Sequence, residues 1–504
     1  MDTFWGPDLE RWFGDAPRLA AFGEVVASEI DPLVYELERN GPATDGERVV
    51  FDSRYADAGR AVWASGILGA EPFEQAGLFY LLTHAGEGGH ACPVTCTAGL
   101  VRALRDHASD ELRERFLPPL LETGYDACQR GSQFLTEEHG GSDVGANLTR
   151  AVPDASNNLS LGEGGAWRLH GEKWFCSVAD ADQFLVTARP EGAPEGTRGI
   201  GCFLVPRLVD GRPNGFTIRK LKDKLGTRAL ATGEVVFEGA LAHPIGPLDQ
   251  GYRIAIGVVL NTSRWLNAVG SAGVMRRAWL EADAFARERV AFGQPIVEFA
   301  LVRESLAVMR AEAEAALAST LELTRLVDSP DPDDLAYHRI LVNANKFSTS
   351  VAATRAVRRG IEILGGNGTV EDYSPLPRLW RDAIVFESWE GTHNVLCAQV
   401  ARDLERYGTL DLVLERSRGV EPRIDAVLDS LAERMRSYDP LHFRRQLDTL
   451  VRAVQGAALV RAGAPTAELH LRRHLVPGYD PECDPEYAGR LDALVDEAAV
   501  ELAG

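Results

Sequence analysis

The chain has 504 residues, of which 45% are hydrophobic, and its formal net charge at pH 7 is −21. That length leaves room for three or more domain-sized units with a sizeable core. The acidic balance argues against a general nucleic-acid or anionic-membrane surface, because both attract basic patches.

The cysteines and the N-terminal residues are used to predict the cellular compartment of the protein. The 7 cysteines include no CxxC pair, so the sequence offers no disulfide or zinc framework. Cys92 and Cys96, near His90, favour a buried structural role, and we predict no metal centre. The first residues lack a basic segment before an apolar run, and no apolar stretch approaches the length of a membrane span. We therefore expect a cytoplasmic protein without a membrane contact.

Residues 1–130 are predicted to form an N-terminal helical domain. Apolar residues recur at helical spacing over residues 19–37, and Pro32 is expected to end or kink a helix there. Further helices are expected near residues 58–68, 97–105 and 110–123.

Residues 131–247 have a different texture, with short apolar runs bounded by Gly, Pro and Asp. Such runs are typical of β-strands, and their close spacing predicts a middle β domain built as a small barrel or sandwich. The dense basic run at 219–224 is interpreted first as a solvated face and second as a contact for a phosphorylated ligand. The clearest candidate strands are residues 183–189, 201–206, 215–219 and 233–238.

Long helical periodicity returns in residues 248–408 and predicts a helical bundle. Residues 305–327 are rich in Ala and Leu with interspersed Glu and Arg, and residues 339–364 form a second such helix. The Gly365-Gly366 pair that follows is typical of a helix end and matches neither a dinucleotide-binding nor a Walker loop. Residues 409–504 are predicted to add a further helical extension.

Two polar segments in the β region carry the strongest functional signal. Residues 133–143 offer hydroxyl groups around a Gly pair, and backbone N–H groups beside hydroxyls suit phosphate or ring-carbonyl acceptors. Residues 171–177 place the indole of Trp174 beside small polar groups, which suits a flat ring held by stacking. A surface turn followed by a core tryptophan explains the same residues, and on these residues alone that explanation is favoured.

Taken together, Gln-Phe-Leu-Thr-Glu-Glu-His-Gly-Gly-Ser-Asp (133–143) and Gly-Glu-Lys-Trp-Phe-Cys-Ser (171–177) resemble the flavin-binding signature of the acyl-CoA dehydrogenase superfamily. The resemblance covers roughly residues 8–407, and the runs Lys-Trp-Phe-Cys-Ser-Val and Leu-Lys-Asp-Lys-Leu-Gly are most similar to the AidB-like branch. It implies an α+β fold with an N-terminal helical domain, a central β-barrel or sandwich and a C-terminal four-helix bundle. In this branch an additional C-terminal helical segment follows.

The resemblance implies FAD as the cofactor. Arg289 matches an arginine that reaches the flavin pyrophosphate across the subunit interface, a role that suits a guanidinium fork. Such shared sites imply a homo-oligomer, either a tetramer or a dimer. The matches to flavin contacts in the two segments are Gln133, Leu135, Thr136, Gly141, Ser142, Trp174, Cys176 and Ser177. The other cofactor matches are Phe292, Glu362, Gly365, Gly366, Thr392 and Asn394.

The predicted catalytic base is Glu390. It lies between Trp389 and Gly391, and burial beside an aromatic ring raises a carboxyl pKa towards neutrality. On the residues alone, a helix-terminal Glu before Gly is favoured. The resemblance instead assigns Glu390 to the family's aromatic-Glu-Gly segment, which follows an Arg-Asp-Ala stretch, with Glu387 as the alternative. By the same resemblance, the expected substrate contacts are Ser142, Arg264 and Gly391.

Four positions depart from the family pattern. Cys176 stands where many members carry a Thr that bonds near the flavin N5 atom, so Ser177 or a backbone group would take that role. Ala291 replaces a hydroxyl residue, and Ala300 and Glu362 stand where Gln is usual. Fewer side-chain contacts would weaken cofactor binding or shift its redox poise.

Three functions are consistent with these residues. The leading hypothesis is FAD-dependent α,β-desaturation of an acyl-CoA or related thioester, with electrons passing to an electron-transfer flavoprotein or to oxygen. The second is an AidB-like stress protein that binds flavin and DNA with little dehydrogenase activity. Residues 401–504 oppose it, because they contain 14 Arg, no Lys and 19 Asp plus Glu. The third is a flavin oxidase acting on a carrier-protein thioester or a small aromatic.

Overall fold

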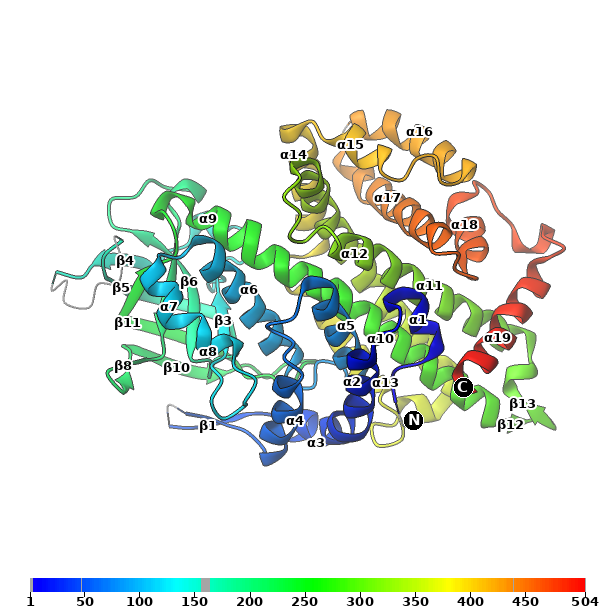
Figure 1. Cartoon of the computed structure of the whole chain (residues 1–504), viewed down its shortest axis with the longest axis horizontal. Helices are drawn as coiled ribbons and strands as arrows, with labels where there is room; N and C mark the ends of the chain where they lie inside the picture. The colour runs from blue at the N-terminus through cyan, green and yellow to red at the C-terminus, as the bar shows by residue number, and fades with distance from the viewer. Residues whose placement is uncertain (1–2, 47, 156–163, 438, 504) are drawn as a thin grey trace. The chain divides into compact units, whose positions relative to one another are not determined.

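The computed structural model describes residues 3–46, 48–155, 164–437 and 439–503. Within it the chain divides into two compact units that alternate along the sequence. The first contains Met1–Ser28, Glu71–Gly86 and Arg264–Gly504, and the second contains Glu29–Ala70 and Glu87–Ser263. The order of helical, β and helical regions expected from the sequence is confirmed (Figure 1). The four-part division at residues 130, 247 and 408 stays a prediction.

Seven strands of the second unit form one sheet, and five of them close into a barrel (Figure 1). The ring runs from β11 through β5, β4, β6 and β7 back to β11, with β10 added to β11 and β3 added to β6. Closure removes free edges from the ring and confirms the expected barrel. The strands are β3 (Gly131–Phe134), β4 (Arg150–Pro153), β5 (Trp167–Ser177), β6 (Gln183–Pro190), β7 (Gly201–Pro206), β10 (Phe216–Leu221) and β11 (Thr232–Pro244).

Burial explains why these segments form strands. β6 and β7 are buried along nearly their whole length, as expected for apolar strands covered on both faces. The rings of Phe134 and Phe184, on the paired strands β3 and β6, stack with centroids 4.9 Å apart. β5 lies outside the clearest candidate strands, because Gly171, Glu172 and Lys173 interrupt its apolar pattern. Two small hairpins complete the unit: β1 (Ala43–Asp45) with β2 (Arg48–Val50), and β8 (Leu208–Val209) with β9 (Arg212–Pro213).

Helices of the second unit pack beside the strands. α6 contacts β3 and the π-helical turn Ala255–Leu260, and Leu100, Leu104 and Val259 belong to their common core. Pro32 lies in the first turn of α3, where its missing N–H has no helical partner to lose. The helices are α3 (Asp31–Asn40), α4 (Ser53–Ala64), α6 (Ala91–His107), α7 (Asp110–Phe116), α8 (Pro118–Leu121) and α9 (Gly251–Ile254).

The first unit is helical, with long antiparallel partners at its centre. α12 packs against α11, α13 and α14, and the short hairpin of β12 (Val290–Ala291) with β13 (Gln294–Pro295) separates α10 from α11 in the chain. Its helices before residue 409 are α1 (Pro7–Phe13), α2 (Pro17–Val25), α5 (Pro72–Leu82), α10 (Asn261–Glu288, entered from the second unit), α11 (Ala300–Thr324), α12 (Pro332–Leu364), α13 (Leu376–Ser388) and α14 (His393–Tyr407).

The C-terminal extension shares a core with this bundle. α17 packs against α11, α12 and α14, and one apolar cluster includes Leu323, Phe347, Leu450 and Val454. The extension therefore cannot be separated from the bundle without exposing apolar surface. Its helices are α15 (Leu410–Glu415), α16 (Pro422–Arg436), α17 (Pro440–Arg461), α18 (Ala467–Leu475) and α19 (Tyr487–Ala503).

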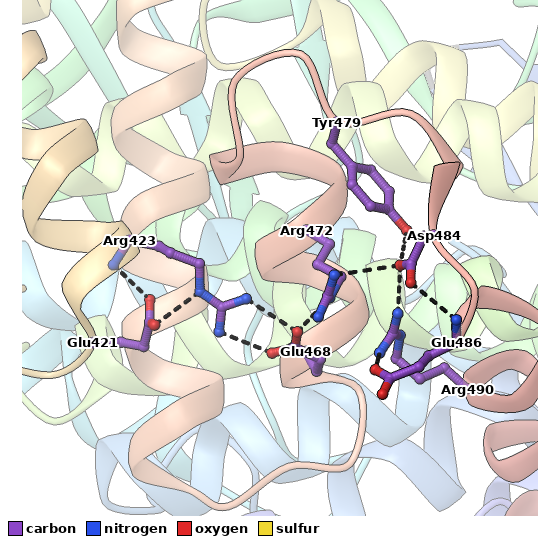
Figure 2. Close-up of polar contacts among 8 residues, drawn as sticks. All are labelled: Glu421, Arg423, Glu468, Arg472, Tyr479, Asp484, Glu486 and Arg490. Atoms are coloured by element: carbon purple, nitrogen blue, oxygen red, sulfur yellow. Dashed lines mark hydrogen bonds and ion pairs between the residues drawn. The ribbon is translucent and has the colours of Figure 1, made fainter. Parts of the chain in front are cut away.

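A chain of ion pairs connects the helices of the extension (Figure 2). Glu468 on α18 accepts from Arg423 at 2.8 Å and from Arg472 at 2.5 Å. Arg472 also reaches Asp484 at 3.5 Å, and Asp484 pairs with Arg490 of α19. The network therefore links α16 and α18 to the beginning of α19. Of the helices in the described ranges, none combines the length and the apolar character needed to cross a membrane.

Candidate active site

The loop between α13 and α14 carries the predicted base. α13 ends at Ser388, and the ring of Trp389 stacks on Phe386 of its last turn, with centroids 5.0 Å apart and planes 14° from parallel. Glu390 then adopts φ 56° and Gly391 φ 108°, which reverse the chain before α14 begins. A left-handed conformation is uncommon for glutamate and persists only where the surrounding structure fixes it.

Two buried cations fix this loop by binding its backbone carbonyl groups. The ammonium of Lys346, whose residue exposure is 0%, donates to the carbonyl oxygens of Glu387 at 3.1 Å, Trp389 at 2.8 Å and Gly391 at 3.1 Å. The Nε atom of Arg264 donates to the carbonyl oxygen of Glu390 at 2.8 Å. Together they satisfy carbonyl groups in the last turn of α13 and directly after it, which would otherwise lack partners.

The Arg264 guanidinium is held in place from its other side. Its Nη1 atom donates to Asn343 Oδ1 at 2.7 Å and to Gln399 Oε1 at 3.1 Å, from α12 and α14. Arg264 is 3% exposed, so the described conformation uses it to support Glu390. Its expected contact with a CoA moiety stays a prediction.

The electrostatics of the loop suit a general base. Burial raises the pKa of Glu390 to about 7, although the positive charges of Arg264 and Lys346 act in the opposite direction. Burial also lowers the pKa of Lys346 to about 7, and the carboxylate of Glu390 opposes that change. A carboxylate with a pKa near neutrality is a stronger base than an ordinary glutamate while still ionising at physiological pH.

Glu387, the alternative base, has a different environment. Its carboxylate lies 3.7 Å from His393 Nε2, and it belongs to the regular last turn of α13. The structure therefore favours Glu390, whose backbone is turned out of the helix and held by Arg264 and Lys346.

In the second unit, the two polar segments lie side by side. The backbone N–H of Trp174 in β5 donates to the carbonyl oxygen of Thr136 at 2.9 Å. Lys173, which is fully buried, lies 2.9 Å from Glu137 in the loop after β3. Glu137 also accepts from the backbone N–H and the hydroxyl of Thr149, at 3.0 and 2.6 Å. The Glu of the first segment and the Lys of the second are thus structural residues that join the two.

A β-bulge presents an aromatic residue that the sequence analysis did not single out. The pairing of β5 with β11 changes register between Lys173 and Cys176, which leaves Trp174 and Phe175 opposite the irregular position. Phe175 is 53% exposed, and Trp174 is half-buried with the Lys222 ammonium 3.1 Å from its ring centroid. An extra aromatic directly after Lys-Trp is the signal in the sequence that could have identified Phe175.

Cys176, a predicted cofactor contact, is buried in the structure. Its residue exposure is 0%, because the bulge turns it into the interior of the sheet, and burial raises the pKa of its thiol. The burial favours a contact through the backbone of Cys176 over one through its thiol, and a contact between this residue and the cofactor stays a prediction. Ser177, the next residue, is half-buried, with its hydroxyl 3.4 Å from that of Thr232.

The remaining residues of the loop fit a flat ring with polar edges. Gln133 donates from Nε2 to Ser263 Oγ at 2.7 Å, while its Oε1 atom is buried and has no hydrogen-bond partner among the residues that the structure describes. A buried acceptor without a donor fits a ligand N–H group. Thr136 is half-buried, Gly141 and Ser142 are exposed, and Leu135 is buried beneath them. Donors, an unmatched acceptor and an aromatic pair are what an isoalloxazine ring needs.

The predicted pyrophosphate-side residues are exposed in the first unit. Arg289 follows α10 and precedes the β12–β13 hairpin, whose tip residue Phe292 has φ 53° and is 98% exposed. The described single chain therefore covers little of this hairpin. Glu362, Gly365 and Gly366 are exposed at the end of α12, and Thr392 and Asn394 are exposed at the start of α14. A shared ligand for these positions stays a prediction.

The basic run at 219–224 is engaged inside its own unit. The carboxylate of Glu234 forms ion pairs with Arg219 at 2.9 Å, Lys220 at 3.3 Å and Lys222 at 2.6 Å. Lys224 donates a hydrogen bond to the carbonyl oxygen of Leu230 at 2.8 Å. These contacts neutralise much of the run and favour a structural role over a contact with a phosphorylated ligand.

Comparison with known proteins agrees with this fold. The model of the acyl-CoA dehydrogenase middle domain matches residues 132–240, and that of the acyl-CoA dehydrogenase C-terminal domain matches residues 249–405, together more than half of the chain. The chain therefore belongs to the acyl-CoA dehydrogenase family. Members of this family bind FAD, which the residues described above fit.

Two curated relatives and one solved structure illustrate the similarity. The chain is 34% identical to AidB of Escherichia coli over 69% of its own length and 64% of that protein. It is 32% identical to acyl-CoA dehydrogenase family member 11 of Caenorhabditis elegans over 77% of its own length and 66% of that protein. It thus spans slightly less than two thirds of both relatives. The crystal structure of Caenorhabditis elegans ACDH-11 in complex with C11-CoA superposes with a TM-score of 0.80 at 26% identity, covering 98% of this chain and 96% of that one.

Proposed function

We propose that this protein is an FAD-dependent oxidoreductase of the acyl-CoA dehydrogenase type that introduces an α,β double bond into an acyl thioester. The observation that carries this proposal is the environment of Glu390, a half-buried carboxylate with a pKa raised to about 7 on a loop fixed by two buried cations. A carboxylate whose pKa is raised in this way is suited to act as a general base for a weakly acidic C–H group.

In the proposed reaction Glu390 removes the proton from the carbon α to the thioester carbonyl. Burial raises the pKa of this carboxylate and keeps it basic. Arg264 and Lys346 hold the loop, so the carboxylate reaches the substrate from a fixed backbone. FAD, when bound, supplies the redox chemistry by accepting the β-hydrogen as hydride.

Several residues are proposed to bind the cofactor in the second unit. The unmatched Gln133 oxygen, the half-buried Thr136 and the exposed Ser142 offer polar contacts, and Trp174 and Phe175 offer aromatic surface. Ser142 is also proposed as a substrate contact, together with Gly391.

A CoA thioester is the proposed substrate class, supported by the C11-CoA complex of the Caenorhabditis elegans relative. An electron-transfer flavoprotein is the proposed electron acceptor, and the protein is proposed to work in the cytoplasm.

A homo-oligomer, tetramer or dimer, is supported by exposed apolar residues that follow Arg289 in the chain: Val290 is 58%, Phe292 98% and Leu301 78% exposed.

Replacing Glu390 by Gln tests the proposal. Glu390→Gln keeps the size of the side chain but cannot accept the proton, so turnover of an acyl-CoA should fall by about 10²- to 10⁴-fold. Glu387→Gln, three residues earlier, is the matched control and should keep most of the activity. FAD absorbance of both purified variants shows whether the cofactor is retained. Undiminished turnover by Glu390→Gln would mean that another group is the base.

The alternative of a DNA-binding flavoprotein has less support. It rests on the similarity to AidB and on the presence of the C-terminal extension. The extension is acidic, and several of its arginines are already paired with carboxylates: Arg416, Arg418, Arg423, Arg436, Arg452, Arg461, Arg472 and Arg490. Duplex DNA binding that weakens steeply with salt would favour this alternative.

The third hypothesis, an oxidase on a carrier-protein thioester or a small aromatic, predicts no flavin reduction by acyl-CoA.

A further inference from the structure

Lys346 occupies an unusual position for a lysine. It lies near the middle of α12, and its ammonium group is enclosed instead of extending to solvent. All three of its hydrogen-bond donors have backbone carbonyl acceptors, on Glu387, Trp389 and Gly391. These acceptors lie in one five-residue stretch, which also contains the proposed base Glu390.

We propose that Lys346 is a positioning residue for Glu390, and that its ammonium fixes the loop and counters the charge of the carboxylate. The inference rests on the proposed role of Glu390 as the base. Lys346 itself makes no contact with the reacting atoms in this proposal and acts through the backbone and the charge of the base.

The geometric part follows from the strain of the loop. Glu390 has φ 56°, and a left-handed conformation of a non-glycine residue requires compensating contacts. Lys346 binds the carbonyls on both sides of Glu390, while Arg264 binds the carbonyl of Glu390 itself. Without Lys346, three enclosed carbonyl groups lose their partner and the loop is free to relax into a commoner conformation. A shift of about 1 Å in a reacting group is sufficient to lower a rate by about 100-fold.

The electrostatic part follows from the groups that face the base. Arg264 on α10 and Lys346 on α12 favour the ionised form of Glu390. Glu387 on α13 and His393 on α14 in turn interact with Lys346. When the charge of Lys346 is removed, Arg264 is the one of these two positive charges that still favours the ionised form of Glu390. The pKa of Glu390 should then rise, and the acid limb of the pH–rate profile should move to higher pH.

Three substitutions separate these contributions. Lys346→Met removes the donors and the charge, Lys346→Gln keeps a donor without the charge, and Lys346→Arg keeps both. Ser350→Ala, one turn further along α12, is the matched control, because Ser350 is buried and its hydroxyl donates to the carbonyl oxygens of Lys346 and Phe347 within α12 itself. Lys346→Met should lower kcat by about 10- to 100-fold with little change in KM, and Lys346→Arg should recover most of the loss. Lys346→Met and Lys346→Gln should both move the acid limb of the pH–rate profile to higher pH, and Ser350→Ala should leave it in place.

A second readout does not depend on acyl-CoA turnover. The unfolding temperature is measured between pH 5 and pH 9 for Lys346→Met, Glu390→Gln and the double variant. Because Lys346 itself titrates in this range, the effect of Lys346→Met should depend on pH in both backgrounds, and the pH dependence should differ between the background with Glu390 and the Glu390→Gln background. If Lys346→Met does not fold, Lys346→Gln is used in the same cycle.

The outcomes distinguish this inference from the proposed function. Coupling in the unfolding cycle without any acyl-CoA turnover would support the link between Lys346 and Glu390 and reject the dehydrogenase reaction. An unchanged acid limb together with identical effects of Lys346→Met in both backgrounds would overturn the inference, whatever the protein catalyses.

Discussion

The ammonium nitrogen of Lys346 lies 2.8 Å from the carbonyl oxygen of Trp389, the residue directly before Glu390. This contact joins the longest helix of the described chain, α12, to the loop that carries the proposed base. Because α12 is packed between α11 and α13, the loop takes its position from the core of the bundle instead of from the flexibility of a surface turn.

The pH dependence of the reaction should report Glu390. Only its ionised form accepts a proton, so kcat/KM should rise with pH and level off above the pKa of about 7. Initial rates with one acyl-CoA in constant-ionic-strength buffers from pH 5 to pH 9 check this, and Glu387→Gln should leave the midpoint unchanged. A midpoint near the ordinary glutamate value of about 4.3 would contradict the burial of the base.

Replacing Arg264 should damage the same loop from its other side. Arg264→Met removes the hydrogen bond to the carbonyl of Glu390 and leaves Asn343 and Gln399 without their cation. Loss of these buried partners should lower the free energy of unfolding by about 1–3 kcal/mol. The acid limb should also move to higher pH, because Arg264 favours ionised Glu390. Denaturant unfolding and a pH–rate profile of one preparation measure both effects. An unchanged midpoint of the pH–rate profile would mean that the guanidinium supports the loop without affecting the ionisation of Glu390.

Breaking the buried ion pair of Glu137 and Lys173 should destabilise the protein more than breaking a surface ion pair. Glu137→Gln or Lys173→Met alone should destabilise by roughly 3–5 kcal/mol, because each leaves a buried charge without its partner. The double variant should lose less than the sum of both. Arg60→Ala, which removes a largely exposed ion pair of the same unit, should change stability by about 0–1 kcal/mol. Additive losses in urea unfolding would show that the two side chains act independently.

Phe175 should matter for the cofactor more than Cys176. Phe175→Ala removes an exposed aromatic surface at the bulge and should raise the Kd for FAD by about 5- to 10-fold, the equivalent of about 1 kcal/mol or more of stacking. Cys176→Ala changes a buried side chain and should lower stability while leaving the Kd nearly unchanged. Titration of the apoprotein with FAD, followed by fluorescence quenching, measures both. The reverse ranking would mean that β5 presents its other face to the ligand.

Acid should destabilise the protein through buried histidines. Burial lowers the pKa of His470 to about 3, and the neighbouring His474 acts in the same direction. The unfolded chain takes up this proton near pH 6.5, so stability is lost as the pH falls from about 6.5 towards 3. His470→Gln should flatten the fall in unfolding temperature over that range, whereas His442→Gln, at an exposed position, should leave it unchanged. Equal slopes for wild type and His470→Gln would show that other groups control acid unfolding.

Much of the fold could be predicted because its signals are local. The apolar run at residues 201–206 coincides with β7, and the helical periodicity of residues 339–364 lies inside α12. Strand β5 was harder to predict, since its buried Lys173 is stabilised by Glu137 from another part of the chain. A polar residue in a strand looks like a solvent-facing position until its distant partner is known.

The site was only partly accessible from the sequence. Glu390 could be predicted from its aromatic and glycine neighbours together with the family resemblance. Lys346 could not, because nothing around it in the sequence distinguishes an enclosed ammonium from a surface lysine on a helix. The bulge that exposes Phe175 and buries Cys176 depends on the register between β5 and β11, which no local pattern specifies.

Anaerobic mixing of the FAD-loaded protein with short, branched and long acyl-CoAs tests the central proposal most directly. At least one of them should bleach the flavin absorbance, and Glu390→Gln should slow that bleaching by about 10²-fold or more while the flavin stays bound. A flavin that remains oxidised with every acyl-CoA, in a protein that binds FAD stoichiometrically, would contradict the proposed desaturation of CoA thioesters.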